Sequence, residues 1–456
     1  MVKKGDKVKT ASGYELTIAD GPKSGGQGSV FLAKSNEGSY ALKIYHEGYL
    51  GSEKNRKKLW DDLLRIYDPG SNGKQPSGAF VWPKDLVKID KSFGYVMDWV
   101  DFKRFKKMNK MKSNTKCNPS LQTKALISLN ICTAFAQLHA KGFCYRDIND
   151  ENIMFDPLNG DIKIIDNDNV GVEGHSTSDV RGVPDYMAPE ILRDFKNVSP
   201  SKRTDYHSLA VYLFQLWCWH HPFEGTKAID CRCFDRDAKV KFFGKEPVFI
   251  FSDIDKTNIL PEIVDKGTID EADYSYVHKF WKTCPPELQS LFRTAFGDGV
   301  NNPEKRILET TWIKVFQKIY DTVNECPYCG AGNCFTPNVP CWSCGKLYKP
   351  PVLLTVKNKN NNTISATVAA VPKKHLLKRH FTRKEADKEV IGIFVTHPQN
   401  PKIIGLKNET SDAWIFVNEK GETKDVPNGR SVPVTTKNVI NFGENYKIYV
   451  GEFIGD

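Results

Sequence analysis

The sequence of residues 145–152 is Tyr-Arg-Asp-Ile-Asn-Asp-Glu-Asn, and our prediction of the fold starts from these eight residues. Asp147 and Asn152 stand five residues apart in it, which places a carboxylate and an amide on one tight loop. The apolar run 162–165 follows, is expected to form a strand and ends directly before Asp166. Each of these features alone can arise by chance, so their interpretation depends on what surrounds them.

A glycine-rich segment precedes this loop in the chain. Residues 25–30 are Gly-Gly-Gln-Gly-Ser-Val, and they lie among runs typical of strands, at 14–19, 29–33 and 40–45. Glycines let backbone N–H groups close over phosphates, although a simple hairpin turn has the same composition. Lys43 stands in the last of these strands. Such a lysine normally points to solvent, but after a glycine-rich hairpin it can instead pair with nucleotide phosphates.

Two further motifs follow the loop. Residues 186–190 are Tyr-Met-Ala-Pro-Glu, and residues 204–209 open an apolar helix. Residues 53–66 and 121–141 also have the composition and spacing of helices. With all five motifs in this order, the chain resembles the eukaryotic-like Ser/Thr protein kinase family across about residues 10–320. The resemblance implies a bilobal α+β fold, with ATP bound between a small β-rich lobe and a larger helical lobe.

The resemblance and the shifts in composition together predict the domain order. We expect a protein kinase domain over residues 1–321, with the small lobe at about 1–97 and the large lobe at about 101–321. A zinc ribbon is expected over residues 322–350 and a C-terminal β-sandwich over residues 351–456, where short β-prone runs alternate with Asn and Gly turns.

The resemblance also implies roles for individual residues. Asp147 matches the catalytic-loop base, Asn152 and Asp166 match the Mg²⁺ ligands, and Lys43 matches the lysine that binds phosphates. These four are the expected catalytic residues. The residues expected to bind the cofactor ATP with Mg²⁺ come from the phosphate loop, the hinge and that catalytic set: Gly25, Gly26, Gly28, Val30, Lys43, Met97, Asp98, Val100, Asn152 and Asp166.

Residues 166–190 resemble the activation segment of these kinases. In kinases with an Arg-Asp pair, the arginine commonly binds a phosphate on this segment, and here that arginine is Arg146. The expected phosphorylation sites are Ser176, Thr177 and Ser178. The resemblance further implies that Glu190 pairs with Arg306 and that Asp205 anchors the catalytic loop.

Several positions depart from the family pattern. Asn149 stands where Ser/Thr kinases carry a lysine that contacts the transferred group, and Asn167-Asp168 replaces Phe-Gly after Asp166. The sequence does not decide which acidic residue pairs with Lys43, and the candidates are Glu53, Asp61 and Asp62. We expect ATP- and Mg²⁺-dependent phosphoryl transfer to Ser or Thr of a protein substrate, with autophosphorylation. The alternative is a pseudokinase scaffold that binds nucleotide or partner proteins without transfer.

Four of the twelve cysteines form two Cys-x-x-Cys pairs, and the others are scattered. The pairs are Cys326 with Cys329 and Cys341 with Cys344, and this spacing is typical of a structural zinc ribbon with four sulfur ligands. Redox-active or free thiols are the alternative. The scattered spacing of the other cysteines favours a reduced, cytoplasmic chain over a chain held together by disulfides.

The C-terminal region resembles the distal half of a forkhead-associated β-sandwich, at residues 405–411, 414–417 and 439–443. The early Gly-Arg signature of that family, which reads phosphothreonine, is not found at its expected position. The order of kinase, zinc ribbon and forkhead-associated-like sandwich is similar to that of bacterial kinases in tellurite-resistance-linked operons. That resemblance implies a von Willebrand A protein and a PP2C-type phosphatase as partners.

Charge is concentrated in one segment of the 456-residue chain. The net charge is +10, and residues 101–116 hold seven basic residues against Asp101, or +7 − 1 = +6. This segment is either a solvated face or a docking patch for an acidic partner. Its two aromatic residues give little support for stacking on nucleic acid. A nucleic-acid-binding module formed by this segment and the zinc ribbon is therefore the weakest of the alternatives. No apolar run reaches the roughly 18 residues that span a bilayer, and the charged start is unlike a secretory signal.

Overall fold

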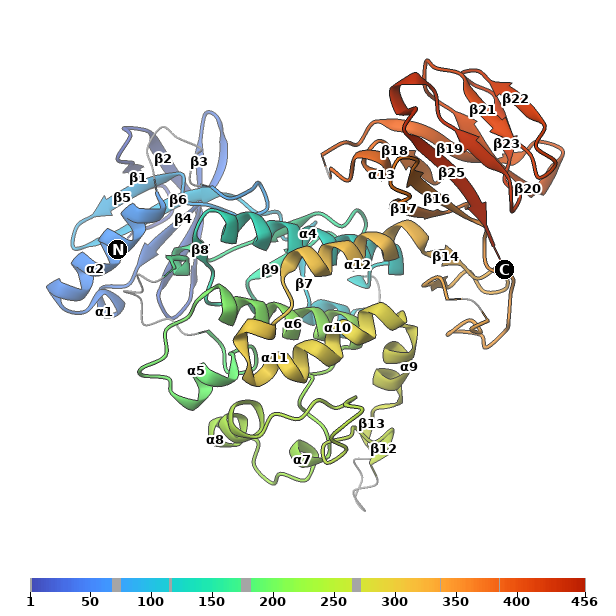
Figure 1. The fold of residues 1–456 in the computed structure, drawn as a ribbon. Coiled ribbons are helices and arrows are strands. Elements are labelled where there is room, and N and C mark those ends of the chain that lie inside the picture. Colours follow the sequence, from blue (N-terminus) through green and yellow to red (C-terminus); the bar gives the residue numbers. More distant parts are fainter. Residues whose placement is uncertain are drawn as a thin grey trace. The chain divides into compact units, whose positions relative to one another are not determined.

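The computed structural model describes residues 2–67, 75–114, 117–173, 182–264, 272–336, 338–384 and 386–455. Contacts divide the chain into two compact units, the first of residues 1–281 and 286–313 and the second of residues 282–285 and 314–456. The division falls within helix α12 (Glu309–Thr322), a few residues before the domain boundary expected at residue 321 (Figure 1). No helix in the described residues combines the length and apolar character that a membrane crossing requires.

The first unit begins with a six-stranded antiparallel sheet that forms a small lobe. In spatial order its strands are β1 (Lys7–Lys9), β2 (Glu15–Ser24), β3 (Gly28–Ser35), β4 (Gly38–Tyr45), β6 (Ser92–Asp98) and β5 (Asp85–Ile89). The three strands expected from the sequence correspond to β2, β3 and β4. One face of the sheet buries a core that includes Leu16, Phe31 and Leu42. Burying such a side chain contributes about 1.5–3 kcal/mol to the stability of the fold. Leu42 lies in β4, so its burial helps to hold β4 in place between β3 and β6.

Two helices follow β4, α1 (Glu47–Leu50) and α2 (Glu53–Ile66). The helix expected over residues 53–66 is confirmed with the same bounds. It begins where the Ser52 hydroxyl accepts a hydrogen bond from the Asn55 backbone N–H, which satisfies one of the free donors of the first turn. Leu63 and Ile66 are buried at its far end, so α2 is packed mainly through its last turns.

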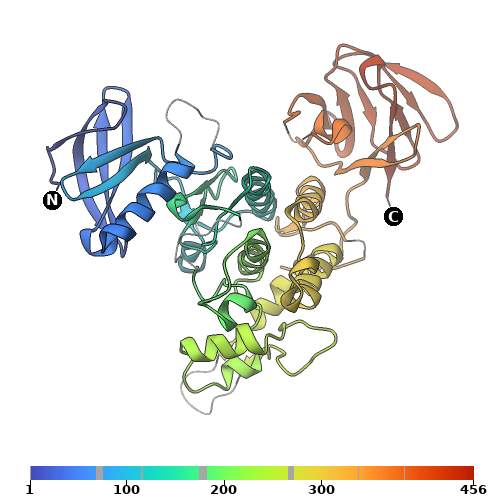
Figure 2. The ribbon, with the colours of Figure 1, turned by 60° about the vertical axis from the view of Figure 1, so that its left-hand side comes forward.

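Two buried helices form the centre of the large lobe, α4 (Leu121–Ala140) and α6 (Lys202–Cys218). They contact each other, as Figure 2 shows. Apolar side chains cover most faces of both helices, which is typical of helices surrounded by protein. The remaining helices of the lobe are α3 (Asn109–Ser113), α5 (Pro189–Arg193), α7 (Thr226–Ile229), α8 (Arg236–Lys239), α9 (Ser275–Thr283), α10 (Pro286–Phe296), α11 (Asp298–Asn301) and α12, with a π-helix η3 (Val240–Lys245).

Short strands hold the loop of residues 145–152 in place. β8 (Phe143–Cys144) pairs with β11 (Gly171–Val172) before the loop. After it, β9 (Ile153–Phe155) pairs with β10 (Ile162–Ile164) and β7 (Lys106–Lys107). A pair β12 (Ile263–Val264) and β13 (Ala272–Asp273) lies farther along the chain. Antiparallel pairing fixes both ends of the loop, so its polar side chains are held in one orientation.

The basic segment 101–116 is partly neutralised where the structure describes it. Arg104 pairs with Asp156 at 2.7 Å and also with Asp161. Lys107 pairs with Glu151 at 2.5 Å, shortly before β9 begins. These ion pairs favour the solvated-face interpretation, since paired side chains offer less charge to a partner.

The second unit contains a cysteine-rich hairpin and two antiparallel sheets. The hairpin strands are β14 (Asn324–Glu325) and β15 (Gly332–Asn333). The first sheet has the order β17 (Ile364–Ala369), β16 (Leu353–Asn358), β25 (Tyr449–Ile454), β24 (Val439–Asn441), β21 (Trp414–Val417) and β22 (Thr423–Val426). The second has the order β18 (His375–Leu377), β19 (Val390–His397), β20 (Asn400–Asn408) and β23 (Ser431–Pro433). Both contribute to one core, which includes the fully buried Trp414.

A buried ion pair joins the end of α12 to the strand-rich part of the second unit. Arg379, in α13 (Arg379–Thr382), donates to both carboxylate oxygens of Asp321, at 3.1 and 2.6 Å. Lys374 Nζ donates to the backbone carbonyls of Asp321 and Val323, at 2.8 and 3.0 Å. These carbonyls end a helix and lack helical partners, so Lys374 caps α12.

Candidate active site

Asp205 anchors the loop that carries Asp147, as the sequence predicted. Near the start of α6, its carboxylate accepts hydrogen bonds from the backbone N–H groups of Tyr145 and Arg146, at 2.6 and 2.9 Å. Arg146 has a φ of 74°, in the left-handed region that non-glycine residues rarely adopt. Two hydrogen bonds to a buried carboxylate hold this strained turn directly before Asp147.

His139, on α4, contacts the carboxylate of Asp205. Its Nε2 lies 3.0 Å from Asp205, and its Nδ1 contacts Glu309. All three side chains are buried. Burial alone would lower the pKa of His139, but the hydrogen bonds to Asp205 and Glu309 outweigh it and raise this pKa to about 9. The imidazolium is therefore the form that the fold selects.

The raised pKa of His139 predicts how stability depends on pH. The pKa rises from 6.5 to about 9 on folding, so the stabilisation is fully present below pH 6.5 and is lost as the pH rises through about 9. We expect the free energy of unfolding to fall by about 3 kcal/mol more in the wild type than in His139→Gln between about pH 6 and pH 10. Denaturant titrations at both pH values measure this difference. Equal pH dependence in both proteins would contradict it.

Asp147 is held by the two asparagines of its own loop. Asn149 Nδ2 donates to one carboxylate oxygen at 2.8 Å, and Asn152 Nδ2 donates to the other at 2.9 Å. Burial raises the pKa of Asp147 to about 6, although these two hydrogen bonds oppose the shift. A carboxylate with a pKa near the working pH suits a group that accepts a proton from a hydroxyl.

Asp166 follows β10 with a φ of 55°, which turns its side chain out of the strand. Its carboxylate is 40% exposed, and one oxygen lies 3.4 Å from Lys43 Nζ. The next side chain, Asn167, is buried and donates to the carbonyls of Val81 and Ile164, both at 2.9 Å. Asn167 thus ties this turn to the protein by hydrogen bonds where the family pattern has an apolar phenylalanine.

Lys43 lies within β4 and is buried. Its partners in the structure are Gln27, Asp166 and Asp168, whereas the sequence left its acidic partner open among residues of α2. Burial lowers the pKa of Lys43, but the negative charges of Asp168 and Asp166 outweigh it and raise the pKa above its ordinary value. The side chain is therefore a buried cation held against carboxylates.

The glycine-rich segment closes over Lys43 as a hairpin between β2 and β3. Gln27 accepts a hydrogen bond from Lys43 at 3.2 Å and donates one to Asn169 at 3.4 Å. A side chain at Gly28 would place its Cβ 2.4 Å from the Ile44 carbonyl oxygen, so only glycine fits there. Gly26 has open space around it, and a Cβ at Gly25 would make only an ordinary contact with the Gly28 carbonyl oxygen, at 3.9 Å. Val30 pairs directly with Lys43 across the two strands.

The expected hinge residues lie at and just beyond the end of β6. Met97 and Val100 are buried, and Asp98 pairs with Lys84 at 2.6 Å. β6 pairs with β4 over the residues around Lys43, so the expected hinge and Lys43 belong to neighbouring strands. This arrangement brings the two sets of predicted residues to one part of the small lobe.

The far end of the expected activation segment is fixed to the large lobe. Arg306 donates to both carboxylate oxygens of Glu190, at 2.8 and 2.6 Å, as the sequence predicted. Ser176, Thr177 and Ser178 lie outside the described residues. Arg146 is buried against Gly171, where any side chain would collide with its guanidinium.

The four cysteines predicted to bind zinc converge in the second unit. Their sulfur atoms all lie within 4.8 Å of one another. Asn333 Nδ2 and the Ser343 backbone N–H donate to Cys341 Sγ, at 3.6 and 3.4 Å. Four converging sulfurs with N–H donors around them fit a tetrahedral Zn²⁺ ion, and they leave no open coordination position.

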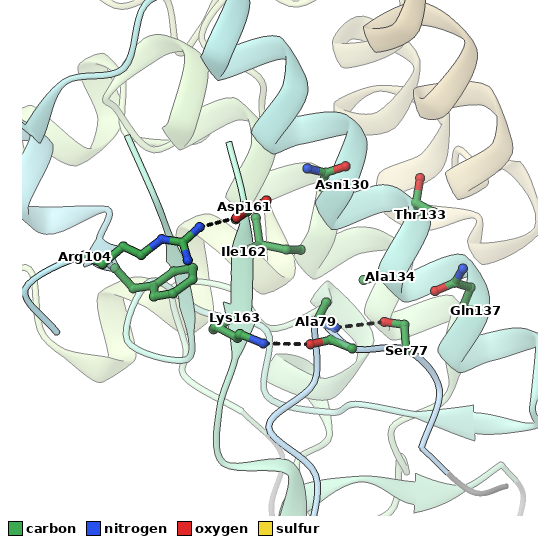
Figure 3. Close-up of a pocket in the computed structure, with 12 residues that line it drawn as sticks. Ser77, Ala79, Arg104, Asn130, Thr133, Ala134, Gln137, Asp161, Ile162 and Lys163 are labelled. Atoms are coloured by element: carbon green, nitrogen blue, oxygen red, sulfur yellow. Dashed lines mark hydrogen bonds and ion pairs between the residues drawn. The ribbon is translucent and has the colours of Figure 1, made fainter. Parts of the chain in front are cut away.

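A cavity of about 420 Å³ lies elsewhere in the first unit (Figure 3). Asn130, Thr133 and Gln137 of α4 line one side of it. Lys163, on the other side, donates to the Gly78 carbonyl at 2.9 Å. Of the predicted site residues that the structure describes, none lines this cavity, so it is separate from the part of the candidate active site described above.

The geometry defines a two-lobed fold with a strand lysine, a loop Asp-Asn pair and a following aspartate at one site. Comparison with known proteins agrees with this class. The family description "Protein kinase domain" matches residues 24–253, and the chain therefore belongs to the protein kinase family.

Individual relatives match shorter segments. Developmentally-regulated protein kinase 1 of Dictyostelium discoideum is 39% identical over 108 residues, 23% of this chain and 15% of that protein. Protein kinase C delta type of Mus musculus is 40% identical over 92 residues, 19% of this chain and 13% of the relative. cAMP-dependent protein kinase type 3 of Saccharomyces cerevisiae is 32% identical over 113 residues, 25% and 27% of the two chains. The matched segments thus cover only a minor part of these relatives.

Proposed function

We propose that the chain transfers the γ-phosphoryl group of ATP to a Ser or Thr hydroxyl of a partner protein. The observation that carries this proposal is the convergence of two pairs, Lys43 with Asp166 at 3.4 Å and Asn152 with Asp147 at 2.9 Å. The backbone joins these pairs, since the N–H of Ile165, directly before Asp166, donates to the Asn152 carbonyl at 2.9 Å. Mg²⁺, when bound with ATP, neutralises phosphate charge. A radiolabelled γ-phosphate transfer assay on the wild-type chain tests the proposal directly.

Each of these residues has a separate role in the proposed reaction. Asn152 and Asp166 would hold the metal ion, and Lys43 with the backbone of the glycine-rich segment would bind the phosphates. Asp147 would orient the acceptor hydroxyl and receive its proton as the bond from that oxygen to the γ-phosphorus forms. The bond between the γ-phosphorus and the bridging oxygen breaks in the same step, and ADP leaves. Little covalent chemistry is required of the protein, so the geometry and charge of these groups account for most of the proposed catalysis.

A second cavity supports a protein as the acceptor. It has a volume of about 460 Å³ and lies where the expected activation segment ends. Met187, Phe195 and Phe234 give it apolar walls, and the ion pair of Lys239 with Asp185 lies at its side. Such a cavity suits an apolar side chain of a polypeptide bound beside the reacting hydroxyl.

The alternative is a pseudokinase scaffold, and one observation favours it. Asn149 donates a hydrogen bond to one carboxylate oxygen of Asp147, at 2.8 Å. The family pattern has a lysine at the position of Asn149, and that lysine is directed at the transferred group. In that case the chain binds Mg·ATP but transfers no phosphate. Measuring nucleotide binding beside transfer distinguishes the two functions.

Phosphorylation of the activation segment is the next prediction. A phosphate on Ser176, Thr177 or Ser178 brings a charge of about −2, which Arg146 can bind through charge-assisted hydrogen bonds. We expect mass spectrometry after incubation with Mg·ATP to find phosphate on residues 174–180. The variant in which Ser176, Thr177 and Ser178 are all replaced by alanine should transfer phosphate more slowly than the wild type. An unmodified segment in a fully active enzyme would show that Arg146 has another role.

We further propose a structural zinc ion at the cysteine cluster and a forkhead-associated-like role for the C-terminal sheets. The support is the convergence of the four sulfurs and the sequence resemblance of residues 405–411, 414–417 and 439–443. A cytoplasmic bacterial signalling or stress-response system, with a von Willebrand A protein and a PP2C-type phosphatase as partners, is the setting that the domain order suggests. Co-purification with such proteins tests this setting.

A further inference from the structure

Asp168 lies at the centre of a buried polar cluster formed by Lys43, Tyr45, Tyr95 and Asp168, here called the Asp168 cluster. Its side chain is only 4% exposed. Lys43 Nζ lies 3.0 and 2.9 Å from its two oxygens. The Tyr45 hydroxyl donates to one oxygen at 2.6 Å and the Tyr95 hydroxyl to the other at 3.0 Å. Each carboxylate oxygen therefore receives two hydrogen bonds.

The two tyrosines fix Asp168 from neighbouring strands. Tyr45 ends β4 and Tyr95 lies in β6, and both rings also flank the ammonium of Lys43, with centroids at 5.6 and 5.9 Å. Burial raises the pKa of both phenols well above the ordinary value, so both remain donors. The carboxylate is thus held by rigid parts of the sheet and has no freedom to swing away from Lys43.

In protein kinases this lysine ordinarily pairs with a glutamate on the helix that corresponds to α2. Here Glu53 and Asp61 of α2 are exposed, and Asp62 pairs with Arg65 at 3.3 Å. Among the described residues, Lys43 finds its carboxylate partners only on the turn after β10. The pairing that α2 would supply is therefore made by a residue two positions after Asp166.

Asp168 also determines what Asp166 can do. A buried ammonium needs a counter-ion, and Asp166 is the other carboxylate in contact with Lys43, at 3.4 Å. Without Asp168, Lys43 would draw Asp166 into a full ion pair and away from a metal ion. With Asp168 in place, Asp166 remains 40% exposed and available.

We propose that Asp168 is the positioning residue for Lys43, in place of an acidic residue on α2, and that it thereby leaves Asp166 free for Mg²⁺. The proposal rests on the phosphoryl-transfer function above. It implies that the phosphate-binding lysine is fixed by the same turn that carries Asp166. Displacement of α2 therefore leaves the lysine in position.

A double-mutant cycle on nucleotide binding tests this proposal. The variants are Lys43→Met, Asp168→Asn and the double variant, each titrated with Mg·ATP by calorimetry and assayed for kcat and KM. Asp168→Asn should weaken Mg·ATP binding about tenfold and lower kcat/KM about 100-fold. In the Lys43→Met background, Asp168→Asn should alter the dissociation constant of Mg·ATP by less than about twofold, because there is no lysine left for Asp168 to position. Asp61→Asn, the matched control on α2, should stay within about twofold of the wild type.

Three outcomes would overturn the proposal: additive effects in the cycle, normal ATP binding by Asp168→Asn, or an equally large loss in Asp61→Asn. If Asp168→Asn is unfolded at the assay temperature, Tyr95→Phe removes one hydrogen bond to Asp168 and should weaken ATP binding about threefold. No effect of Tyr95→Phe would then overturn it. A wild type that binds Mg·ATP without transfer contradicts only the proposed catalysis, whereas one that binds no Mg·ATP contradicts both.

Discussion

Asp166→Ala is expected to lower the rate of phosphoryl transfer at least about 1,000-fold, a loss of about 4 kcal/mol in transition-state stabilisation. The reason is electrostatic, since the exposed carboxylate beside Lys43 is the group proposed to hold Mg²⁺ against the phosphates. Removing it leaves developing charge without its counter-ion. Radiolabelled γ-phosphate transfer, measured as autophosphorylation, gives the rate.

The backbone at Asp166 requires a second variant. Its φ of 55° is left-handed, a conformation that alanine adopts at a cost of about 1 kcal/mol and that asparagine tolerates better. Asp166→Asn removes the charge and keeps the shape, so it should be as inactive as Asp166→Ala while melting near the wild type. Asp161→Ala, which removes an exposed carboxylate of the same lobe, should retain activity. Wild-type autophosphorylation by both Asp166→Ala and Asp147→Ala would refute the kinase function.

The sequence predicted those parts of the site that depend on local order along the chain. Asp147 and Asn152 belong to one loop, so their spacing alone brought them together, at 2.9 Å. The pair of Glu190 with Arg306 was also predicted, because the family resemblance supplied a contact between residues 116 positions apart. Where the chain follows the family, long-range contacts can be transferred residue by residue.

The partner of Lys43 was not predictable in this way. Asp168 lies 125 positions further along the chain, and the family pattern directs attention to α2 instead. The signal that was available is the replacement of Phe-Gly by Asn167-Asp168, since a second carboxylate two positions after Asp166 is costly to bury without a cation. The Tyr45 and Tyr95 hydroxyls gave no sequence signal, because tyrosines in strands are most often apolar packing residues.

The order of the strands in the sheets of the second unit could not be predicted from the sequence, for a different reason. Residues 414–417 were predicted as a strand and form β21. However, β16 pairs with β25 across about a hundred residues, joining Leu353 to Ile454. Alternation of apolar residues shows which face of a strand is buried, and it carries no information about which distant strand lies beside it.

Cys329→Ser is expected to unfold residues 322–350 locally and to leave Mg·ATP binding by the first unit unchanged. The region has little apolar core of its own, with Cys326 and Cys341 among its few buried side chains, so metal binding would supply most of its folding free energy. Structural zinc sites contribute on the order of 10 kcal/mol, and losing one of four thiolate ligands forfeits much of it. Metal analysis should find one zinc per wild-type chain and less than one in the variant, and hydrogen exchange should localise the loss of structure.

Cys334→Ser is the matched control for the zinc prediction. Cys334 stands between the two Cys-x-x-Cys pairs in sequence, yet it is not among the four sulfurs that converge. Its substitution by serine should therefore keep both the metal content and the exchange protection of residues 322–350. Freshly purified wild-type protein without zinc would contradict the proposed site. Equal metal loss in Cys329→Ser and Cys334→Ser would show that the ligand set differs from the converging four, because a closed tetrahedral site has no place for a fifth sulfur.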